Sequence, residues 1–122
     1  MVGLKILFPG TGYIFTKLKM KRVAFKMFLK LGNEAEYQKR HDKIWPELKE
    51  LFRRAGISDY SIFFDRETNF HFAVKQLDEN CAQNTESKMI IAKWWAYMAD
   101  IMDTNPDNSP VSVQLKEVFY MK

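Results

Sequence analysis

The sequence has little of the material from which disulfide frameworks and metal centres are built. It contains one cysteine, Cys81, and two histidines, His41 and His71, among 122 residues. One cysteine cannot close an internal disulfide, which excludes a disulfide-stapled secreted domain and favours a reducing, cytoplasmic location. These three residues do not have the spacing of zinc ligands, so we predict no metal ion. The absence of a Gly-rich phosphate-binding motif also argues against a nucleotide cofactor.

Long apolar runs and a strong excess of one charge are missing as well. No stretch of 18 apolar residues occurs, so we expect no membrane-spanning helix and no membrane partner. The net charge of +4 lies mainly in residues 1–19, which hold three lysines and no acidic residue. The remaining residues carry 16 of the 19 Lys and Arg against all 15 Asp and Glu. Because no basic stripe is present, we expect no nucleic-acid partner.

The length of 122 residues suits one domain, and apolar residues at 47% are enough for a packed core. Aromatic residues make up 15% of the chain, which leaves rings for a pocket as well as for the core. Residues 1–19 differ from the rest, since they hold three of the five glycines and a Pro9-Gly10 breaker. We predict that they are a dispensable extension before a single domain at 20–122. The alternative is an extra hairpin at the edge of a sheet.

Hydrophobic periodicity predicts alternating strands and helices in the body of the chain. Alternation with a period of two predicts strands over 22–30, 57–65 and 70–77, and the β-rich residues 118–120 predict a last one. Apolar spacings of three and four predict helices over 34–44, 46–55 and 90–102. Asn33 and Glu36 are spaced as a capping box before the first helix, and Gly56 is placed to end the second.

The order β-α-β-β-α-β is that of an α+β, ferredoxin-like fold, with an antiparallel sheet and helices on one face. The opposite face of such a sheet stays uncovered. Phe28 and Phe63 lie among polar neighbours on that side of their strands. An uncovered, partly aromatic face favours an interface. We therefore expect a homodimer of the dimeric α+β barrel type.

Candidate chemistry centres on Tyr37 and His41, which are four residues apart on one side of a predicted helix. A phenol and an imidazole on an inward face need partners, because each unpaired group costs about 1–3 kcal/mol. Two interpretations remain open: a capped pair within the core, or the wall of a pocket between helix and sheet. For His71, on a strand between two phenylalanines, we expect a sheet-face residue with a satisfied hydrogen bond.

The pair Trp94-Trp95 is the other unusual feature. Adjacent helical residues point about 100° apart, so one ring can pack in the core while the other borders a cavity. A wholly core role for both is the alternative. Together with Tyr60, these aromatic residues could form a sugar site, since indole faces bind the apolar faces of sugars. No carboxylate pair suggests glycoside hydrolysis.

Several segments resemble the signatures of the L-rhamnose mutarotase family. Residues 37–48 (YQKRHDKIWPEL) resemble its YxxRHxxIWPEL motif, and residues 94–98 (WWAYM) resemble its paired-Trp helix. Residues 105–110 (NPDNSP) and 117–120 (EVFY) resemble its C-terminal motif. The resemblance extends over Met20–Met121 and leaves residues 1–19 outside.

This resemblance implies a cofactor-free, dimeric enzyme that interconverts the α and β anomers of L-rhamnose or a related deoxysugar. It makes His41 the catalytic proton donor and Tyr37, Tyr60, Trp94 and Trp95 the sugar-binding residues. A second proton carrier is not identified by it, and Tyr37, Asp107 and ordered water are all candidates. The alternative functions are a cofactor-free oxygenase or a small-ligand-binding module of the same fold, and a non-catalytic dimeric interaction module.

Overall fold

The structure is a computed structural model that describes residues 3–8, 12–17, 20–81 and 85–122. The body of the chain contains strands β3 (Met20–Phe28), β4 (Ile57–Asp65), β5 (Phe70–Asp78) and β6 (Ser112–Leu115), helices α1 (Glu34–Asp42), α2 (Pro46–Arg54) and α3 (Thr85–Met98), and the short 3₁₀ helix η1 (Ala99–Ile101). Among the described residues, none of the helices reaches the length and hydropathy that crossing a bilayer requires.

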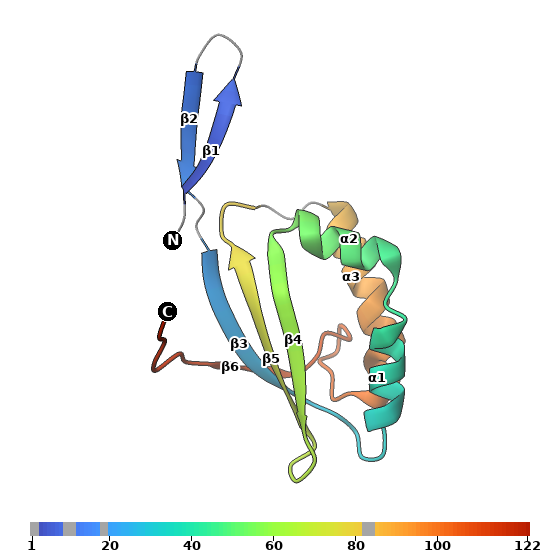
Figure 1. Cartoon of the computed structure of the whole chain (residues 1–122). Coiled ribbons are helices and arrows are strands. Elements are labelled where there is room, and N and C mark those ends of the chain that lie inside the picture. Colours follow the sequence, from blue (N-terminus) through green and yellow to red (C-terminus); the bar gives the residue numbers. More distant parts are fainter. Residues whose placement is uncertain (1–2, 9–11, 18–19, 82–84) are drawn as a thin grey trace.

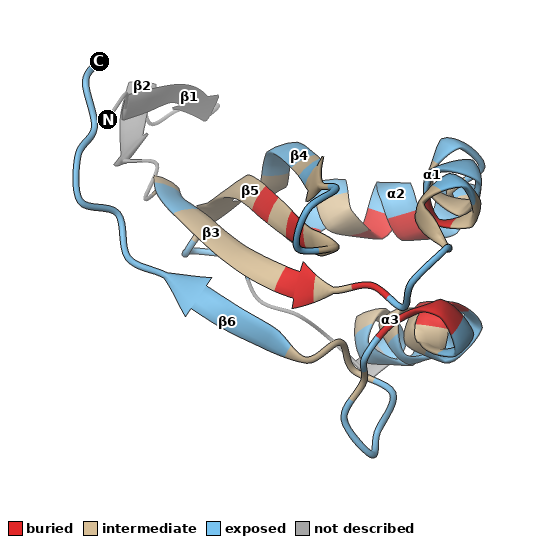
Figure 2. Ribbon diagram, turned by 90° about the horizontal axis from the view of Figure 1, so that it is seen from below, coloured by how far each residue is buried: buried red, intermediate tan, exposed pale blue. Residues whose placement is uncertain are grey.

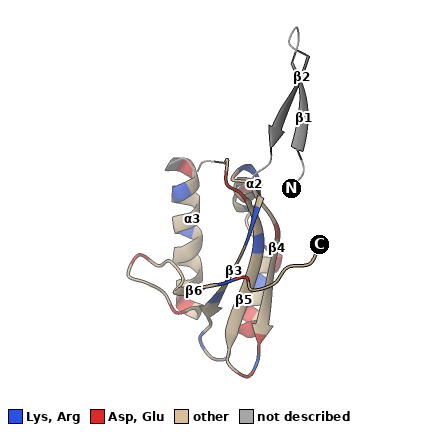
Figure 3. Cartoon of the chain, turned by 90° about the vertical axis from the view of Figure 1, so that its left-hand side faces the viewer, with Lys and Arg blue, Asp and Glu red and all other residues tan. Residues whose placement is uncertain are grey.

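The four strands form one antiparallel sheet in the order β4-β5-β3-β6. All three α-helices lie on the same side of this sheet (Figure 1). The predicted antiparallel α+β architecture with helices on one face is therefore confirmed. Both basic and acidic residues occur on the helices and on the sheet (Figure 3).

The core lies between the sheet and the helices, where the buried residues gather (Figure 2). Leu48 and Leu51 of α2 are almost fully buried. Leu48 belongs to one buried cluster with Tyr37 of α1, Ala73 of the central strand β5 and Met98 of α3. Each fully buried leucine contributes about 1.5–3 kcal/mol through the water it displaces. This packing fixes α1 and α2 above the sheet and so determines what faces the space between them.

A β-bulge in β4 sets the direction of Tyr60. Ser58 pairs with Gln76 and Ser61 pairs with Val74, so Asp59 and Tyr60 together stand opposite the single residue Lys75. Asp59 adopts a φ of 49°, in the left-handed region that Asp and Asn tolerate better than most residues. The extra residue shifts the alternation by one. Tyr60 therefore lies on the helix-covered side of the sheet instead of the opposite side.

The side of the sheet away from the helices is rich in apolar residues and stays uncovered in the single chain. Phe63 is 62% exposed there, and Val113 and Leu115 of β6 are also exposed. Phe28 and Phe70 pack edge to face across β3 and β5, with ring centroids 4.8 Å apart. We call this surface the outer face.

The predicted last strand at residues 118–120 is wrong. The strand β6 ends at Leu115, which pairs with Ala24, and Val118 and Phe119 are 87% and 78% exposed. β-rich residues need a neighbouring strand to pack beside, and the pairing with β3 does not continue beyond Leu115. Tyr120 instead lies under the guanidinium of Arg22, 4.3 Å from the ring centroid. The C-terminal segment runs past β6, away from the helices (Figure 1).

The predicted capping box at the start of α1 is also wrong. Asn33 precedes the helix, but its Nδ2 donates hydrogen bonds backwards to the carbonyls of Lys30 and Leu31, each at 3.1 Å. Its side chain therefore does not accept from the first turn. The carboxylate of Glu36 accepts a hydrogen bond from Arg40 at 3.0 Å. At the end of α2 the prediction is confirmed, since Gly56 follows the helix with a φ of 82°.

Part of the N-terminal segment forms a hairpin. Strands β1 (Gly3–Phe8) and β2 (Gly12–Lys17) pair antiparallel and make a two-stranded sheet of their own. This hairpin does not extend an edge of the four-stranded sheet, which was the alternative to a dispensable extension. That residues 1–19 are dispensable stays a prediction.

Candidate active site

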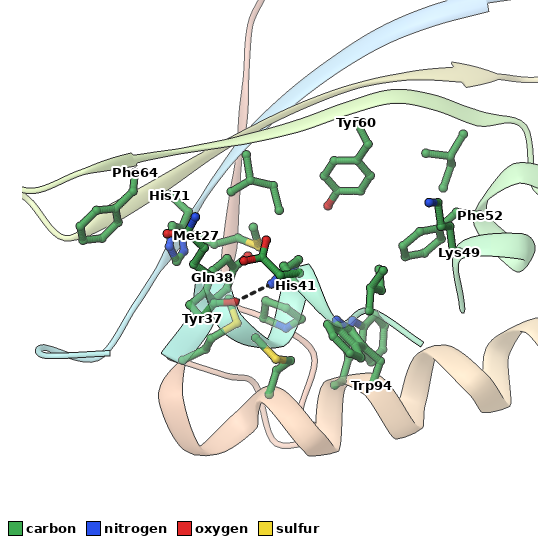
Figure 4. Close-up of a pocket in the computed structure, with 18 of the residues that line it drawn as sticks. Met27, Tyr37, Gln38, His41, Lys49, Phe52, Tyr60, Phe64, His71 and Trp94 are labelled. Atoms are coloured by element: carbon green, nitrogen blue, oxygen red, sulfur yellow. Dashed lines mark hydrogen bonds between the residues drawn. The ribbon is translucent and has the colours of Figure 1, made fainter. Parts of the chain in front are cut away.

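A cavity of about 1050 Å³ lies between the sheet and the helices. This is at the upper end of the roughly 300–1,000 Å³ range that is common for small-molecule sites. All five predicted site residues border it, together with His71: Tyr37, His41, Tyr60, Trp94 and Trp95 come from α1, β4 and α3. In Figure 4, Tyr60 reaches from the sheet toward the helices. The structure thus brings together side chains that the sequence separates by more than 50 residues.

The position of His41 fixes its tautomer. One turn of α1 separates it from Tyr37, and its Nδ1 lies 3.0 Å from the Tyr37 carbonyl oxygen (Figure 4). A carbonyl oxygen can only accept, so Nδ1 carries the hydrogen and Nε2 keeps a lone pair in the neutral ring. Burial lowers the pKa of His41 below 6.5, although the hydrogen bond to Tyr37 and the charge of Asp42 act in the opposite direction. The ring is therefore neutral at neutral pH and can accept a proton.

Tyr37 lies between two imidazole rings. Its ring centroid is 4.2 Å from that of His41 and 3.9 Å from that of His71, with interplanar angles of 27° and 28°. Burial and the neighbouring Tyr60 raise the pKa of Tyr37 well above 10, and burial raises the pKa of Tyr60 to about 12. Both phenols therefore keep their protons at neutral pH. They can donate hydrogen bonds to a ligand in the cavity.

The tryptophan pair both packs in the core and borders the cavity, which were the two roles left open by the sequence. Trp94 is buried in the core and also borders the cavity, and Trp95 is half-buried at the cavity wall. The ring of Trp94 meets His41 edge-on at 5.4 Å and Trp45 at 5.1 Å. For Tyr37 and His41 the open alternatives were a pair within the core or the wall of a pocket. Both apply to Tyr37, because it is only 7% exposed and also borders the cavity.

Sequence reasoning gave His71 a satisfied hydrogen bond, and this is wrong. His71 is 2% exposed, and its Nδ1 has no hydrogen-bond partner among the described residues. It stands opposite Met27 and Phe64 in the sheet, which offer no polar group to it. Burial and the nearby His41 lower the pKa of His71 to about 4. The position of His71 in the strand predicted a place on the sheet face, but the described neighbours offer Nδ1 no hydrogen-bond partner.

Arg40 is a residue whose role the sequence analysis missed. It holds α1 against the end of α3, because its Nη1 donates to Asp100 Oδ1 at 2.7 Å and to the Tyr97 carbonyl at 2.8 Å. A second bond joins Nη2 to Asp100 Oδ2 at 3.1 Å, which makes the pair bidentate. Arg40 therefore fixes the spacing between the helices that carry His41 and Trp94. The position of Arg40 next to His41 in the sequence was the feature that could have indicated this role.

The loop motif at residues 105–110 has an internal role. Asp107 accepts hydrogen bonds from the backbone N–H and the hydroxyl of Ser109, and these bonds lower the pKa of Asp107. Asn105 also donates to the Ser109 hydroxyl at 3.0 Å. Pro110 borders the cavity, but Asp107 is not among the residues that do. The structure therefore gives no support to Asp107 as a proton carrier. Over the described ranges, no three His, Cys, Asp or Glu side chains gather as metal ligands.

Comparison with known proteins places this site in a family. A sequence model described as L-rhamnose mutarotase matches residues 22–121. The L-rhamnose mutarotase of Bacteroides thetaiotaomicron is 59% identical over 103 residues, which cover 84% of this chain and 99% of that protein. The corresponding protein of Rhizobium johnstonii is 54% identical over 106 residues, covering 85% of this chain and 99% of its own.

A solved structure agrees with these matches. The crystal structure of an L-rhamnose mutarotase from Formosa agariphila is similar with a TM-score of 0.75 and 53% sequence identity, covering 84% of this chain and 99% of that one. Most of each relative therefore aligns with the part of this chain that builds the sheet, the helices and the cavity. The chain belongs to the L-rhamnose mutarotase family.

Proposed function

We propose that this protein catalyses the interconversion of the α and β anomers of L-rhamnose by acid–base opening and reclosure of the sugar ring. The observation that carries the proposal is the state of His41. Its Nδ1 is held by the Tyr37 carbonyl at 3.0 Å, and its ring borders a cavity with aromatic walls. A neutral imidazole with one fixed nitrogen and one free nitrogen is suited to move a proton at neutral pH.

In this mechanism, Nε2 of His41 takes the proton of the anomeric hydroxyl. The bond between C1 and the ring oxygen breaks as that oxygen receives a proton, and the open-chain aldehyde forms. Both oxygens are attached to C1, so a single imidazole can reach them in turn. After rotation about the C1–C2 bond the steps reverse, and the ring closes on the other face of the aldehyde. Positioned acid–base catalysis of this kind supplies about 10²–10⁴-fold acceleration.

We assign Tyr37 and Tyr60 to hydrogen bonding of the sugar. The raised pKa of each phenol makes proton loss unfavourable, so Tyr37 and Tyr60 orient oxygen atoms and leave the proton transfer to His41. We assign Trp94 and Trp95 to the apolar face and the methyl group of the deoxysugar. Because imidazole and phenol groups accompany the aromatic walls, this cavity suits a polyhydroxylated ligand better than the flat, apolar substrate of an oxygenase.

We further propose that the fold is ferredoxin-like and that the active form is a homodimer joined through the outer face. The sheet order β4-β5-β3-β6 together with the β-α-β-β-α-β chain order supports the fold assignment. The exposed Phe63, Val113 and Leu115 support the interface, because an apolar sheet face of this kind needs cover. The exposed apolar residues Val118 and Phe119 on the C-terminal segment would then contact the second copy.

Anomer exchange measured by saturation-transfer NMR on equilibrated L-rhamnose tests the proposed reaction. We expect the wild-type protein to accelerate exchange and His41→Ala to abolish the acceleration while remaining folded. Lys39→Ala is the matched control, since Lys39 lies exposed on the same helix and away from the cavity. Wild-type exchange no faster than in buffer would refute the mutarotase activity and favour a binding module.

A binding measurement tests the aromatic wall. Trp94→Ala and Trp95→Ala should weaken sugar binding by about 1–3 kcal/mol, by analogy with the stacking of bases on aromatic side chains. Binding is measured by NMR titration with L-rhamnose. Unchanged affinity in both variants would contradict the assignment of these rings to the sugar.

In the exchange assay, activity that survives in His41→Ala would place the acid–base role on another residue.

A further inference from the structure

His71 is a cavity residue that the proposed reaction does not use. It lies on the central strand β5, borders the cavity and is 2% exposed. Its ring stacks on Tyr37 at 3.9 Å, and Phe64 lies 5.2 Å away. Its Nδ1 makes no hydrogen bond with the described part of the chain. The corresponding nitrogen of His41 is held by a carbonyl oxygen, so the two histidines differ sharply.

Packing alone does not account for a histidine at this position. The neighbours are the rings of Tyr37 and Phe64, and Met27 stands opposite in the sheet, so a phenylalanine would fill the space with no polar atom to satisfy. A buried nitrogen without a partner costs about 1–3 kcal/mol. Such a group in a folded protein calls for a specific explanation, and a role in binding is one of the few available. Because His71 borders the cavity, an occupant of the cavity can meet the imidazole ring.

We propose that His71 is a specificity-determining residue that exchanges a hydrogen bond with one secondary hydroxyl of the bound sugar. The inference rests on the proposed function, since it takes the occupant of the cavity to be a 6-deoxyhexose. Tyr37 separates His71 from His41, with its ring 4.2 Å from one and 3.9 Å from the other. With His41 acting at C1, the hydroxyl that His71 meets belongs to another ring carbon.

The chemistry of the two groups matches. A neutral imidazole has one donor and one acceptor, and a sugar hydroxyl is also both donor and acceptor. Within the described part of the chain no group holds Nδ1 of His71, so this nitrogen can take whichever role the hydroxyl leaves open. The low pKa that burial gives His71 keeps it neutral at working pH, which avoids a second cation beside His41. The stacked rings of His41, Tyr37 and His71 thus offer two imidazoles and one phenol side by side.

The test combines a ring-preserving variant with deoxy sugars. His71→Phe keeps a flat ring on Tyr37 and removes both nitrogens. Dissociation constants for L-rhamnose and its 2-, 3- and 4-deoxy analogues are measured by NMR titration for the wild-type and variant proteins. We expect L-rhamnose to bind the variant about tenfold more weakly, which corresponds to about 1.4 kcal/mol. One deoxy analogue should bind both proteins equally, because it lacks the hydroxyl in question.

The exchange rate at saturating sugar should change less than twofold, since His71 acts on binding and not on the proton transfer. His71→Gln, which retains a donor and an acceptor, should recover part of the affinity. Equal weakening of all four sugars, or no weakening, would overturn the proposal and leave His71 as a packing residue. If His71→Phe does not fold, His71→Leu is titrated in the same way. Failure of the proposed function itself would show in the wild-type exchange assay, which does not involve these variants.

Discussion

At the scale of single residues, the two histidines show that local surroundings give the same side chain two different pKa values. Both lie near Tyr37, and burial lowers the pKa of each. His41 retains a backbone partner that favours its protonated form. Nδ1 of His71 has no partner among the described residues, and the pKa of His71 is about 4. The ring to which we assign the proton transfer is therefore the easier of the two to protonate.

This difference predicts a pH dependence of stability. The folded-state pKa of His71 is about 4 against an ordinary value of 6.5, so between these values the unfolded chain binds a proton that the folded chain does not. Stability is therefore lost as pH falls through this window and is unaffected by His71 above it. We expect His71→Phe to reduce the loss in unfolding free energy between pH 7.5 and pH 4.5 by about 2–3 kcal/mol.

Urea denaturation of both proteins at the two pH values, at equal protein concentration, measures this difference. Carboxylates titrate in both proteins, so comparing the two pH dependences reports on His71 together with its interaction with His41. Identical pH dependence in wild type and variant would contradict the low pKa of His71.

The sequence could predict the pairing of Tyr37 with His41, because a spacing of four on one helix is a local relation. It could not predict that His71 completes a stack with Tyr37. That contact joins residues 34 positions apart and depends on how α1 sits over β5. The interaction of Arg40 with Asp100 is equally non-local, at 60 positions.

At the scale of secondary-structure elements, the bulge in β4 is the feature on which the cavity depends. Alternation from Ile57 without an extra residue would place Tyr60 on the outer face. The sequence predicted the strand over residues 57–65. It did not predict the bulge, since a single Asp in the left-handed region leaves no distinct sequence pattern. Likewise, the end of β6 depends on its pairing with β3, and β-propensity alone placed that strand too late.

The backbone at Asp59 provides a test of the bulge. A β-branched residue is strongly disfavoured at a φ of 49°, so Asp59→Val should destabilise the protein by about 1–2 kcal/mol and weaken sugar binding by displacing Tyr60. Asp59→Gly is the matched control, because glycine adopts this φ without steric cost. Thermal denaturation and NMR titration with L-rhamnose check both effects. A valine variant as stable as the glycine variant would contradict this account of the bulge.

At the scale of the whole molecule, the uncovered outer face predicts association. Phe63→Asp should shift the protein from dimer to monomer at micromolar concentration, because it places a charge in the proposed apolar interface. Light scattering measures the mass. Leu31→Asp is the control, since Leu31 is 87% exposed but lies in the turn after β3. A wild-type protein that is monomeric under these conditions would refute the interface.

The N-terminal hairpin gives the other prediction at this scale. Removal of residues 1–19 should leave folding, association and anomer exchange unchanged, because β1 and β2 form a sheet separate from the one that lines the cavity. Circular dichroism, light scattering and the exchange assay compare the truncated and full-length chains. Aggregation or loss of the dimer after truncation would show that the hairpin is structural.

The arrangement of the tryptophans has an optical consequence. The chain has three, and all of them belong to this region: Trp94 and Trp95 border the cavity, and Trp45 packs on Trp94 at 5.1 Å. Almost all of the indole emission therefore originates within one or two rings of the proposed sugar site. An imidazolium quenches indole fluorescence, and His41 lies 5.4 Å from Trp94. The unlabelled protein thus carries a built-in fluorophore whose brightness reports ligand occupancy and the charge of His41.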